Sequence, residues 1–440
     1  MGLIFSALCC LGECACCLAC RSCCCCGSRS DKKAEGNNGR CGSLTIMLLT
    51  VGFSLLCQYV LGKYFEYYAF EDGCGNSHAC MGAAAVYRIS MVSALFFFVL
   101  AIVGRVEPAL HDSFWGCKFW GWILALVVAW FLPNPIFFGY IWVARIGSFL
   151  FVILQQILLI DLAYYVNDTL VTAADEGTSD EICGLALPLI ILLAMSFLCF
   201  AIAITGIALL FVYFGTSCES PNLILSLTIV LLCIAIPCQL FISKDSNLLT
   251  SSFVSVYTVY LAAAALSANP VESCNPFYSN SSDWLSILLG ITFIVIVLLY
   301  TIWSASTNAK YLKDGRADQK VSDNGPGGNM MNKILTGQLE SGDTTTEDSQ
   351  PSGADLEESN ADRKSSAEVC SFCIVMGLMA MNVAMVLTNW GSTHRGGGQA
   401  SSPSSGKVAM FMQAASQWTC LALFIWTLVA PSLFPDRDFS

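Results

Sequence analysis

Two ionisable residues, Arg145 and Asp161, lie inside the apolar segment 136–166, where a charged group is costly and is by default a functional candidate. A guanidinium group binds phosphate through paired, charge-assisted hydrogen bonds. If the segment is a helix that turns about 100° per residue, Gln156 lies on nearly the same face as Arg145, and Asp161 lies on almost the opposite face. We take Arg145, Gln155, Gln156 and Asp161 as candidates for a polar path through this segment.

The sequence offers Arg145 no acidic partner within any other apolar segment. Asp283 and Glu368 lie at the ends of such segments, and Glu107 lies beyond one. The remaining partners for Arg145 are helix-end carbonyls, water or a lipid phosphate. Two structural alternatives stay open: the side chain extends to the membrane interface, or it binds an unwound carbonyl of a neighbouring helix.

Catalytic motifs are missing from the sequence. It contains no H-E-x-x-H, no G-x-S-x-G and no P-loop, and its three histidines, His78, His111 and His394, are scattered over three loops. The sequence therefore predicts a protein that is not an enzyme and that needs neither a cofactor nor a metal ion.

The candidate residues sit in a strongly apolar chain. Apolar residues make up 55% of it and charged residues 12%, and its mean hydropathy is +0.64, which excludes an ordinary soluble domain. A helix needs about 20 mostly apolar residues to cross a bilayer. Ten segments qualify or come close: 44–61, 83–104, 117–132, 136–166, 183–214, 221–242, 248–268, 284–303, 368–390 and 408–430. We predict an all-α, polytopic integral membrane protein with ten transmembrane helices.

The basic residues predict the orientation of these spans. With ten spans, the side that holds both termini carries 16 of the 21 lysines and arginines, so both termini are expected in the cytoplasm. An alternative adds residues 3–20 as an eleventh span. The net charge of −11 comes largely from the hydrophilic segment 314–362 and does not imply a nucleic-acid partner. The plasma membrane and endomembranes such as Golgi, endosome and endoplasmic reticulum are all compatible locations.

The same topology divides the 24 cysteines into two groups. Eleven lie in residues 9–41, on the predicted cytoplasmic side, where thiols stay reduced. Their spacing does not match a zinc site, and we expect acylation at Cys23, Cys24, Cys25 and Cys26, with N-myristoylation of Gly2 as a further candidate. The cysteines in predicted exterior loops are Cys74, Cys80, Cys218 and Cys274. Four cysteines allow three pairings; we predict Cys74–Cys80 and Cys218–Cys274.

Two glycosylation sequons begin at Asn167 and Asn280. The topology places only Asn280 outside, so it is the glycosylation candidate. The chain then divides into a Cys-rich cytoplasmic segment (1–43), helices one to eight (44–303), a disordered acidic cytoplasmic loop (304–367), helices nine and ten (368–431) and a cytoplasmic tail (432–440).

Short motifs along the whole chain resemble the serine incorporator (SERINC/TDE/TMS) family and occur in the family's order. They are 85–90 (AVYRIS) with 95–98 (LFFF), 111–115 (HDSFW), Gln155 with 158–161 (LLID), 267–270 (SANP) with 273–276 (SCNP), 342–346 (GDTTT), and 426–431 (WTLVAP) with 437–440 (RDFS). The resemblance implies two helical bundles separated by a long oblique helix. Segment 136–166 fits that helix, because its 31 residues would span about 46 Å.

The resemblance also implies lipid handling, with membrane phospholipids as partners. Our leading hypothesis is phospholipid scrambling, in which headgroups cross along a polar groove between the bundles, in support of phosphatidylserine and sphingolipid synthesis. The alternative is a carrier or scaffold that delivers serine to lipid-synthesising enzymes.

Overall fold

The computed structural model describes residues 38–64, 78–107, 110–111, 113–175, 181–182, 185–215, 218–241, 248–276, 288, 291–292, 294–296, 353–388, 390 and 403–433. In this part of the chain, eight helices are long and apolar enough to cross a membrane, and one further apolar helix, Trp115–Trp130, is shorter. The predicted all-α polytopic class is confirmed. The predicted eighth span, 284–303, lies mostly outside the described residues, so the count of ten stays a prediction.

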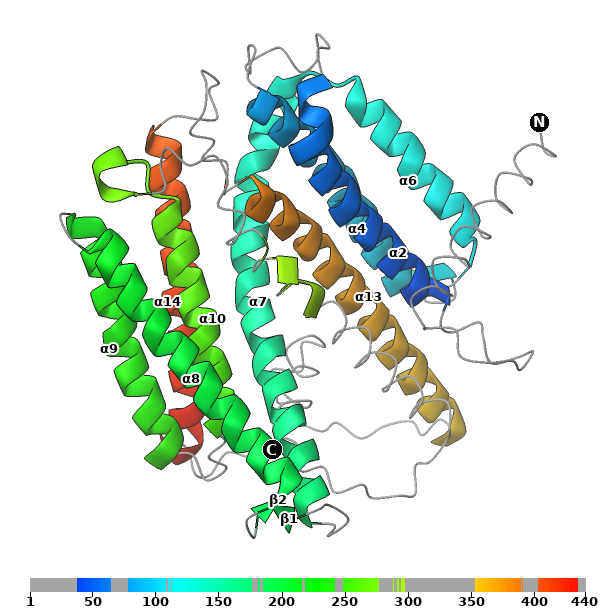
Figure 1. Cartoon of the computed structure of the whole chain (residues 1–440). Coiled ribbons are helices and arrows are strands. Elements are labelled where there is room, and N and C mark those ends of the chain that lie inside the picture. The colour runs from blue at the N-terminus through cyan, green and yellow to red at the C-terminus, as the bar shows by residue number, and fades with distance from the viewer. Residues whose placement is uncertain are drawn as a thin grey trace, which may run out of the picture.

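One bundle combines the N-terminal helices with a helix from late in the sequence (Figure 1). It contains α2 (Asn38–Leu56), α4 (His78–Val106), α6 (Trp115–Trp130) and α13 (Gly353–Leu387), and α2 continues into the π-helix η2 (Cys57–Leu61) and the 3-10 helix η3 (Gly62–Tyr64). Helices α4 and α13 approach closely because Gly104 and Gly377 leave room for the side chains of Val369 and Phe98. This packing joins segments that are nearly 300 residues apart.

The second bundle contains α8 (Leu187–Phe214), α9 (Glu219–Phe241), α10 (Leu248–Ser267) and α14 (Pro403–Leu433). A two-residue antiparallel pair, β1 (Glu181–Ile182) and β2 (Leu185–Ala186), precedes α8, and the 3-10 helix η4 (Glu272–Cys274) follows α10. The Gln417 amide nitrogen on α14 donates to the Thr228 hydroxyl on α9, at 2.8 Å, and to the Thr258 carbonyl on α10, at 3.2 Å. One side chain thus ties three helices of this bundle together.

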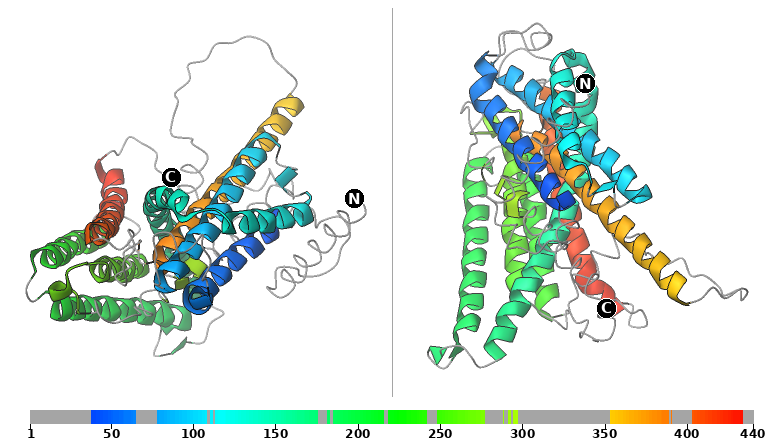
Figure 2. Two further views of the ribbon diagram at one scale, coloured as in Figure 1. Left: turned by 90° about the horizontal axis from the view of Figure 1, so that it is seen from above. Right: turned by 90° about the vertical axis from the view of Figure 1, so that its right-hand side faces the viewer.

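Helix α7 (Asn134–Asp175) runs between the two bundles and packs against both (Figures 1 and 2). It contacts α4 and α13 on one side and α8, α10 and α14 on the other. Its 42 residues span about 63 Å, twice a hydrocarbon core of about 30 Å, so it must tilt or extend beyond the membrane. The predicted arrangement of two bundles about a long fourth helix is confirmed, and the helix is longer than segment 136–166.

Buried hydroxyl pairs connect the helices of the first bundle to each other and to α7. The Ser90 hydroxyl on α4 donates to the Ala380 carbonyl on α13 and therefore accepts from Tyr140 on α7. The Thr388 hydroxyl donates to the Ala384 carbonyl, so it accepts from Tyr87 at 2.7 Å. Such bonds average about 0.6 kcal/mol each in membrane proteins. The Tyr140–Ser90 bond joins α7 to the first bundle, and the Tyr87–Thr388 bond joins α4 to the end of α13.

Helix α13 begins earlier than the sequence analysis expected. It starts at Gly353, within the predicted disordered loop 304–367 and well before the predicted span at 368–390. The segment contains Ala, Leu, Glu, Lys and Arg residues, which are good helix formers. The last part of the predicted loop is therefore a helical extension of the ninth predicted span.

Candidate functional site

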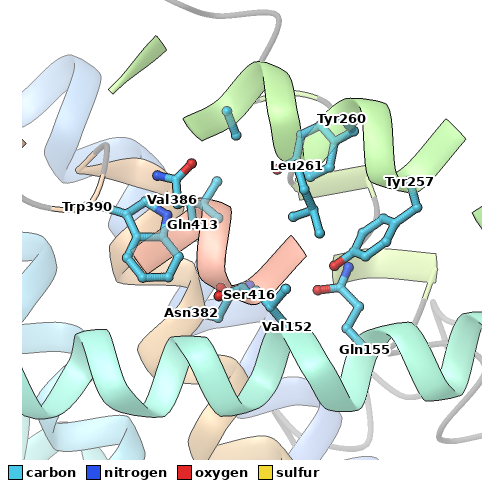
Figure 3. Close-up of a pocket in the computed structure, with 11 residues that line it drawn as sticks. Val152, Gln155, Tyr257, Tyr260, Leu261, Asn382, Val386, Trp390, Gln413 and Ser416 are labelled. Carbon is cyan, nitrogen blue, oxygen red and sulfur yellow. The ribbon is translucent and has the colours of Figure 1, made fainter. Parts of the chain in front are cut away.

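A small cavity with several polar side chains in its lining lies where α7 meets α10, α13 and α14 (Figure 3). Its volume is about 30 Å³, and it sits between the two bundles. The lining residues come from all four helices: Val152, Gln155, Tyr257, Tyr260, Leu261, Ala264, Asn382, Val386, Trp390, Gln413 and Ser416. The lining contains amides, hydroxyls and aromatic rings and has no acidic or basic side chain, so it can bind neutral polar groups by hydrogen bonding.

The side-chain amides that line this cavity differ in whether they have hydrogen-bond partners. Asn382 accepts a 2.6 Å hydrogen bond from the Ser148 hydroxyl on α7, and the Gln155 amide points toward Tyr257 in Figure 3. Gln413 is only 3% exposed, and neither its amide nitrogen nor its amide oxygen has a hydrogen-bond partner among the described residues. An unsatisfied buried amide costs about 1–3 kcal/mol, so Gln413 marks this cavity as a place where a polar group should bind.

Arg145 lies outside the lining and holds one of the lining residues in place. Its Nε and Nη2 groups donate to the Trp390 carbonyl oxygen at 3.3 and 3.0 Å, and its guanidinium stacks on the Trp142 ring, 4.8 Å from the ring centroid. The side chain is 3% exposed. Of the alternatives that the sequence left open, the structure shows the bond to a carbonyl at the unwound end of a neighbouring helix.

Trp390 has an unusual backbone conformation. Its φ angle is 56°, in the left-handed region, where a residue other than glycine costs about 1–2 kcal/mol. This conformation follows the end of α13 and turns the Trp390 carbonyl to Arg145, while the indole ring covers one end of the cavity beside Gln413 (Figure 3). The Arg145 hydrogen bonds offset this strain, so Arg145 is a positioning residue for the ring.

Of the other three residues of the predicted polar path, only Gln155 lies at the cavity. Gln155 lines the cavity, whereas Gln156, the residue predicted to share a face with Arg145, is absent from the lining. Gln156 is 3% exposed and both of its amide atoms lack a partner among the described residues. Asp161 is also buried and lies outside the lining. A projection of α7 alone does not predict this result, because packing against α10, α13 and α14 determines which α7 side chains face the cavity.

Sequence reasoning missed Asn382, Gln413 and Ser416, because it considered neutral polar residues only in segment 136–166 and searched the other apolar segments for charged residues. A signal was present in segment 408–430. Gln413, Ser416 and Gln417 follow an i, i+3, i+4 spacing, which places three polar side chains on one face of an apolar helix. In the part of the chain that the structure describes, no three His, Cys, Asp or Glu side chains are grouped so that they could hold a metal ion.

The cysteines agree in part with the predicted pairing. Cys218 and Cys274 form a disulfide, as predicted. Cys80 is also disulfide-bonded, but Cys74 lies outside the described residues, so the Cys74–Cys80 pair stays a prediction. Cys117 is a disulfide cysteine as well, which sequence reasoning missed because it placed this residue at the start of the third span and outside the exterior loops.

Removing the Cys218–Cys274 disulfide should destabilise the second bundle. The bond joins residues 56 positions apart, and a loop of that length corresponds to about 4 kcal/mol in the chain-entropy relation. We expect the double variant Cys218→Ser/Cys274→Ser to melt at a lower temperature in detergent under non-reducing conditions. The control is Cys233→Ser, a free and exposed cysteine on α9. A double variant that melts with the wild type would contradict the stabilising role.

The remaining predicted modification sites differ in what the structure says of them. Asn280, Gly2, Cys23, Cys24, Cys25 and Cys26 lie outside the described residues, so their modification stays a prediction. The other sequon residue, Asn167, is 7% exposed within α7. A glycosyltransferase needs an accessible asparagine, so burial in a helix disfavours this site.

Glycosylation of Asn280 provides a test of the predicted topology. We expect glycosidase treatment of the protein from eukaryotic cells to lower its mass, and Asn280→Gln to abolish that shift. Asn167→Gln is the matched control and should leave the shift unchanged, because Asn167 is buried in α7. A glycosidase-sensitive mass that survives Asn280→Gln and disappears with Asn167→Gln would invert the assigned orientation.

Comparison with known proteins places the whole chain in one family. The family model "Serine incorporator (Serinc)" matches residues 8–437. A probable serine incorporator of Nematostella vectensis is 30% identical over 399 residues, which cover 85% of this chain and 84% of the relative. Serine incorporator 3 of Mus musculus is 26% identical, over 82% and 80% of the two chains, and serine incorporator 5 of Danio rerio is 26% identical, over 98% of each. Together with the eight membrane-length helices of the described residues, α7 among them, these matches show that the chain is a multi-pass membrane protein of the serine incorporator family.

Proposed function

We propose that this protein moves phospholipid headgroups between the leaflets along the polar junction of its two bundles, in support of phosphatidylserine and sphingolipid synthesis. The proposal rests on one observation. Four polar side chains from α7, α13 and α14 converge where α7 meets both bundles: Gln155, Asn382, Gln413 and Ser416. A headgroup that crosses hydrocarbon without polar partners pays a large desolvation penalty. Amides and hydroxyls at the junction offset part of it, while the acyl chains stay in the membrane.

Unpaired amides beside the cavity support the junction as the route. Two buried glutamines, Gln156 on α7 and Gln413 on α14, have no partner for either amide atom within the described residues, and Gln413 lines the cavity. Unpaired amides at the junction can exchange partners with a passing headgroup. Transport then requires the bundles to part, because the cavity of about 30 Å³ is far smaller than a headgroup.

Reconstitution of the full chain into liposomes tests the proposal. Dithionite quenching of fluorescent phospholipid measures scrambling, and we expect quenching to exceed the half that protein-free liposomes show. The double variant Gln155→Leu/Gln413→Leu should scramble more slowly, because it removes two cavity amides. Gln239→Leu is the control, since it makes the same change at a buried glutamine of α9 outside the cavity. Wild-type quenching equal to that of empty liposomes would contradict the function, and wild-type rates in the double variant would contradict the route.

The same liposomes distinguish the alternative of serine carriage. Uptake of labelled serine into the lumen, with no excess quenching of lipid, would favour the carrier. The dimensions of the cavity argue against an occluded serine site in this conformation. At about 10–15 Å³ per water, a cavity of about 30 Å³ holds roughly two waters, whereas serine has seven non-hydrogen atoms.

A further inference from the structure

We propose that the cavity beneath Trp390 is a built water site that holds about two waters, hydrogen-bonded to Gln413 and Gln155. The first observation is the Gln413 side chain. It is 3% exposed, lines the cavity, and has no hydrogen-bond partner for its amide nitrogen or its amide oxygen among the described residues. A glutamine amide offers two donors and an acceptor, and waters in the cavity would satisfy both ends.

The second observation is the match between the volume and the lining. A buried water needs about 10–15 Å³ and two to four polar partners, and the cavity provides about 30 Å³ lined by Gln155, Gln413 and Ser416. An apolar cavity of similar size would stay dry. The cavity therefore meets both requirements for hydration.

The charges near the cavity favour water over an ion. No carboxylate lines the cavity to compensate a cation, and the Arg145 guanidinium lies next to it, bound to the Trp390 carbonyl. An anion would need a positive lining group or backbone donors, and Arg145 uses its Nε and Nη2 donors on that carbonyl. A neutral ligand with both donors and acceptors is what remains.

Trp390 closes this water site on one side. Its indole ring lies beside Gln413 (Figure 3), and its carbonyl is held by Arg145. The waters then keep the junction of α7, α10, α13 and α14 polar even when the bundles are packed together. The site would exist whether or not the protein moves lipid, so its test needs no transport assay.

Radiolytic hydroxyl-radical labelling of the purified full chain in nanodiscs measures this hydration directly, because radicals formed from a bound water oxidise the side chains beside it. Tyr257 lines the cavity and is 2% exposed, and Tyr87 is 4% exposed, outside the cavity and bonded to Thr388. If solvent exposure alone controlled the labelling rate, both buried tyrosines would be oxidised slowly and at similar rates. We expect Tyr257 to label several-fold faster than Tyr87, with the exposed Tyr64 as the positive control.

Filling the cavity should abolish the difference. Ala264 lines the cavity, and the neighbouring Ala263 on α10 does not. Ala264→Val should lower Tyr257 labelling to the rate of Tyr87, while Ala263→Val should leave it unchanged. Gln413→Leu, which removes the unpaired amide, should also lower the labelling of Tyr257. This variant replaces Ala264→Val in the test if Ala264→Val fails to fold. Equal labelling of Tyr257 and Tyr87 in the wild type would overturn the proposal, as would fast Tyr257 labelling that persists in a folded, filled variant.

Discussion

Replacing Arg88 with alanine should lower the stability of the protein by about 3 kcal/mol, the sum of a cavity and an orphaned carbonyl. Arg88 is completely buried in α4. It donates to the Leu132 carbonyl at 2.7 Å, and its guanidinium lies 4.5 Å from the centroid of the Phe137 ring. Leu132 ends the turn between α6 and α7, and Phe137 is in the first turns of α7. Arg88 thus fixes the point where the long helix enters the structure.

Removing the buried Arg88 charge does not offset this loss of stability, because the charge is also costly in the unfolded state. In separated helices that remain inserted in the membrane, Arg88 would still lie within the apolar span Cys80–Val106, without the Leu132 carbonyl, so its charge is at least as costly there as in the folded protein. We expect a lower melting temperature in detergent, measured by fluorescence-detected size-exclusion chromatography. Arg105→Ala, at an exposed arginine of the same helix, is the control and should lie within about 0.5 kcal/mol of the wild type. Equal melting of Arg88→Ala and Arg105→Ala would refute the anchoring role.

Replacing Arg145 with leucine should release Trp390 without unfolding the protein. Hydrogen bonds from a charged donor contribute about 1.5–3 kcal/mol, and Arg145 makes two to one carbonyl. A loss of about 2 kcal/mol corresponds to about 30-fold easier opening. We expect amide hydrogen exchange in the peptide that contains Thr388 and Trp390 to accelerate by about that factor, because the left-handed conformation of Trp390 loses the contact that stabilises it.

Two variants separate this effect from a general loss of packing. Arg145→Lys should accelerate exchange less than Arg145→Leu, because an ammonium group keeps the charge but lacks the planar fork that gives two bonds. Gln156→Leu changes another buried residue of α7 and leaves the Arg145–Trp390 bonds in place, so exchange at Trp390 should match the wild type. If exchange at Trp390 is the same in Arg145→Leu as in the wild type, Arg145 does not hold the ring.

Helix location was predictable because it depends on local composition. Runs of Leu, Ile, Val, Phe and Ala that exceed the bilayer thickness predicted the described spans and the long α7. The ends of helices were predicted less well. Hydropathy finds the part of a helix that lies in hydrocarbon, and it misses extensions beyond that part, such as the start of α13 at Gly353 and the end of α7 at Asp175.

The Cys218–Cys274 disulfide was also predicted, because the topology placed both residues among four exterior cysteines, which allow three pairings. The partner of Arg145 was not. The Trp390 carbonyl lies 245 positions away in sequence, and every residue has a carbonyl, so nothing in the residue type distinguishes this one. Its availability depends on where α13 ends and on the left-handed conformation of Trp390.

The sequence by itself determined the class of the protein, its membrane-crossing segments, its family resemblance and one disulfide, because each follows from residue type and order along the chain. Only the tertiary structure decided that Gln155 and not Gln156 meets Gln413 and Ser416 at the cavity, and that Arg145 binds a backbone carbonyl. Helical periodicity fixes which residues share a face of one helix. Which faces of four helices converge is set by packing among segments far apart in the chain, and the cavity chemistry arises from that convergence.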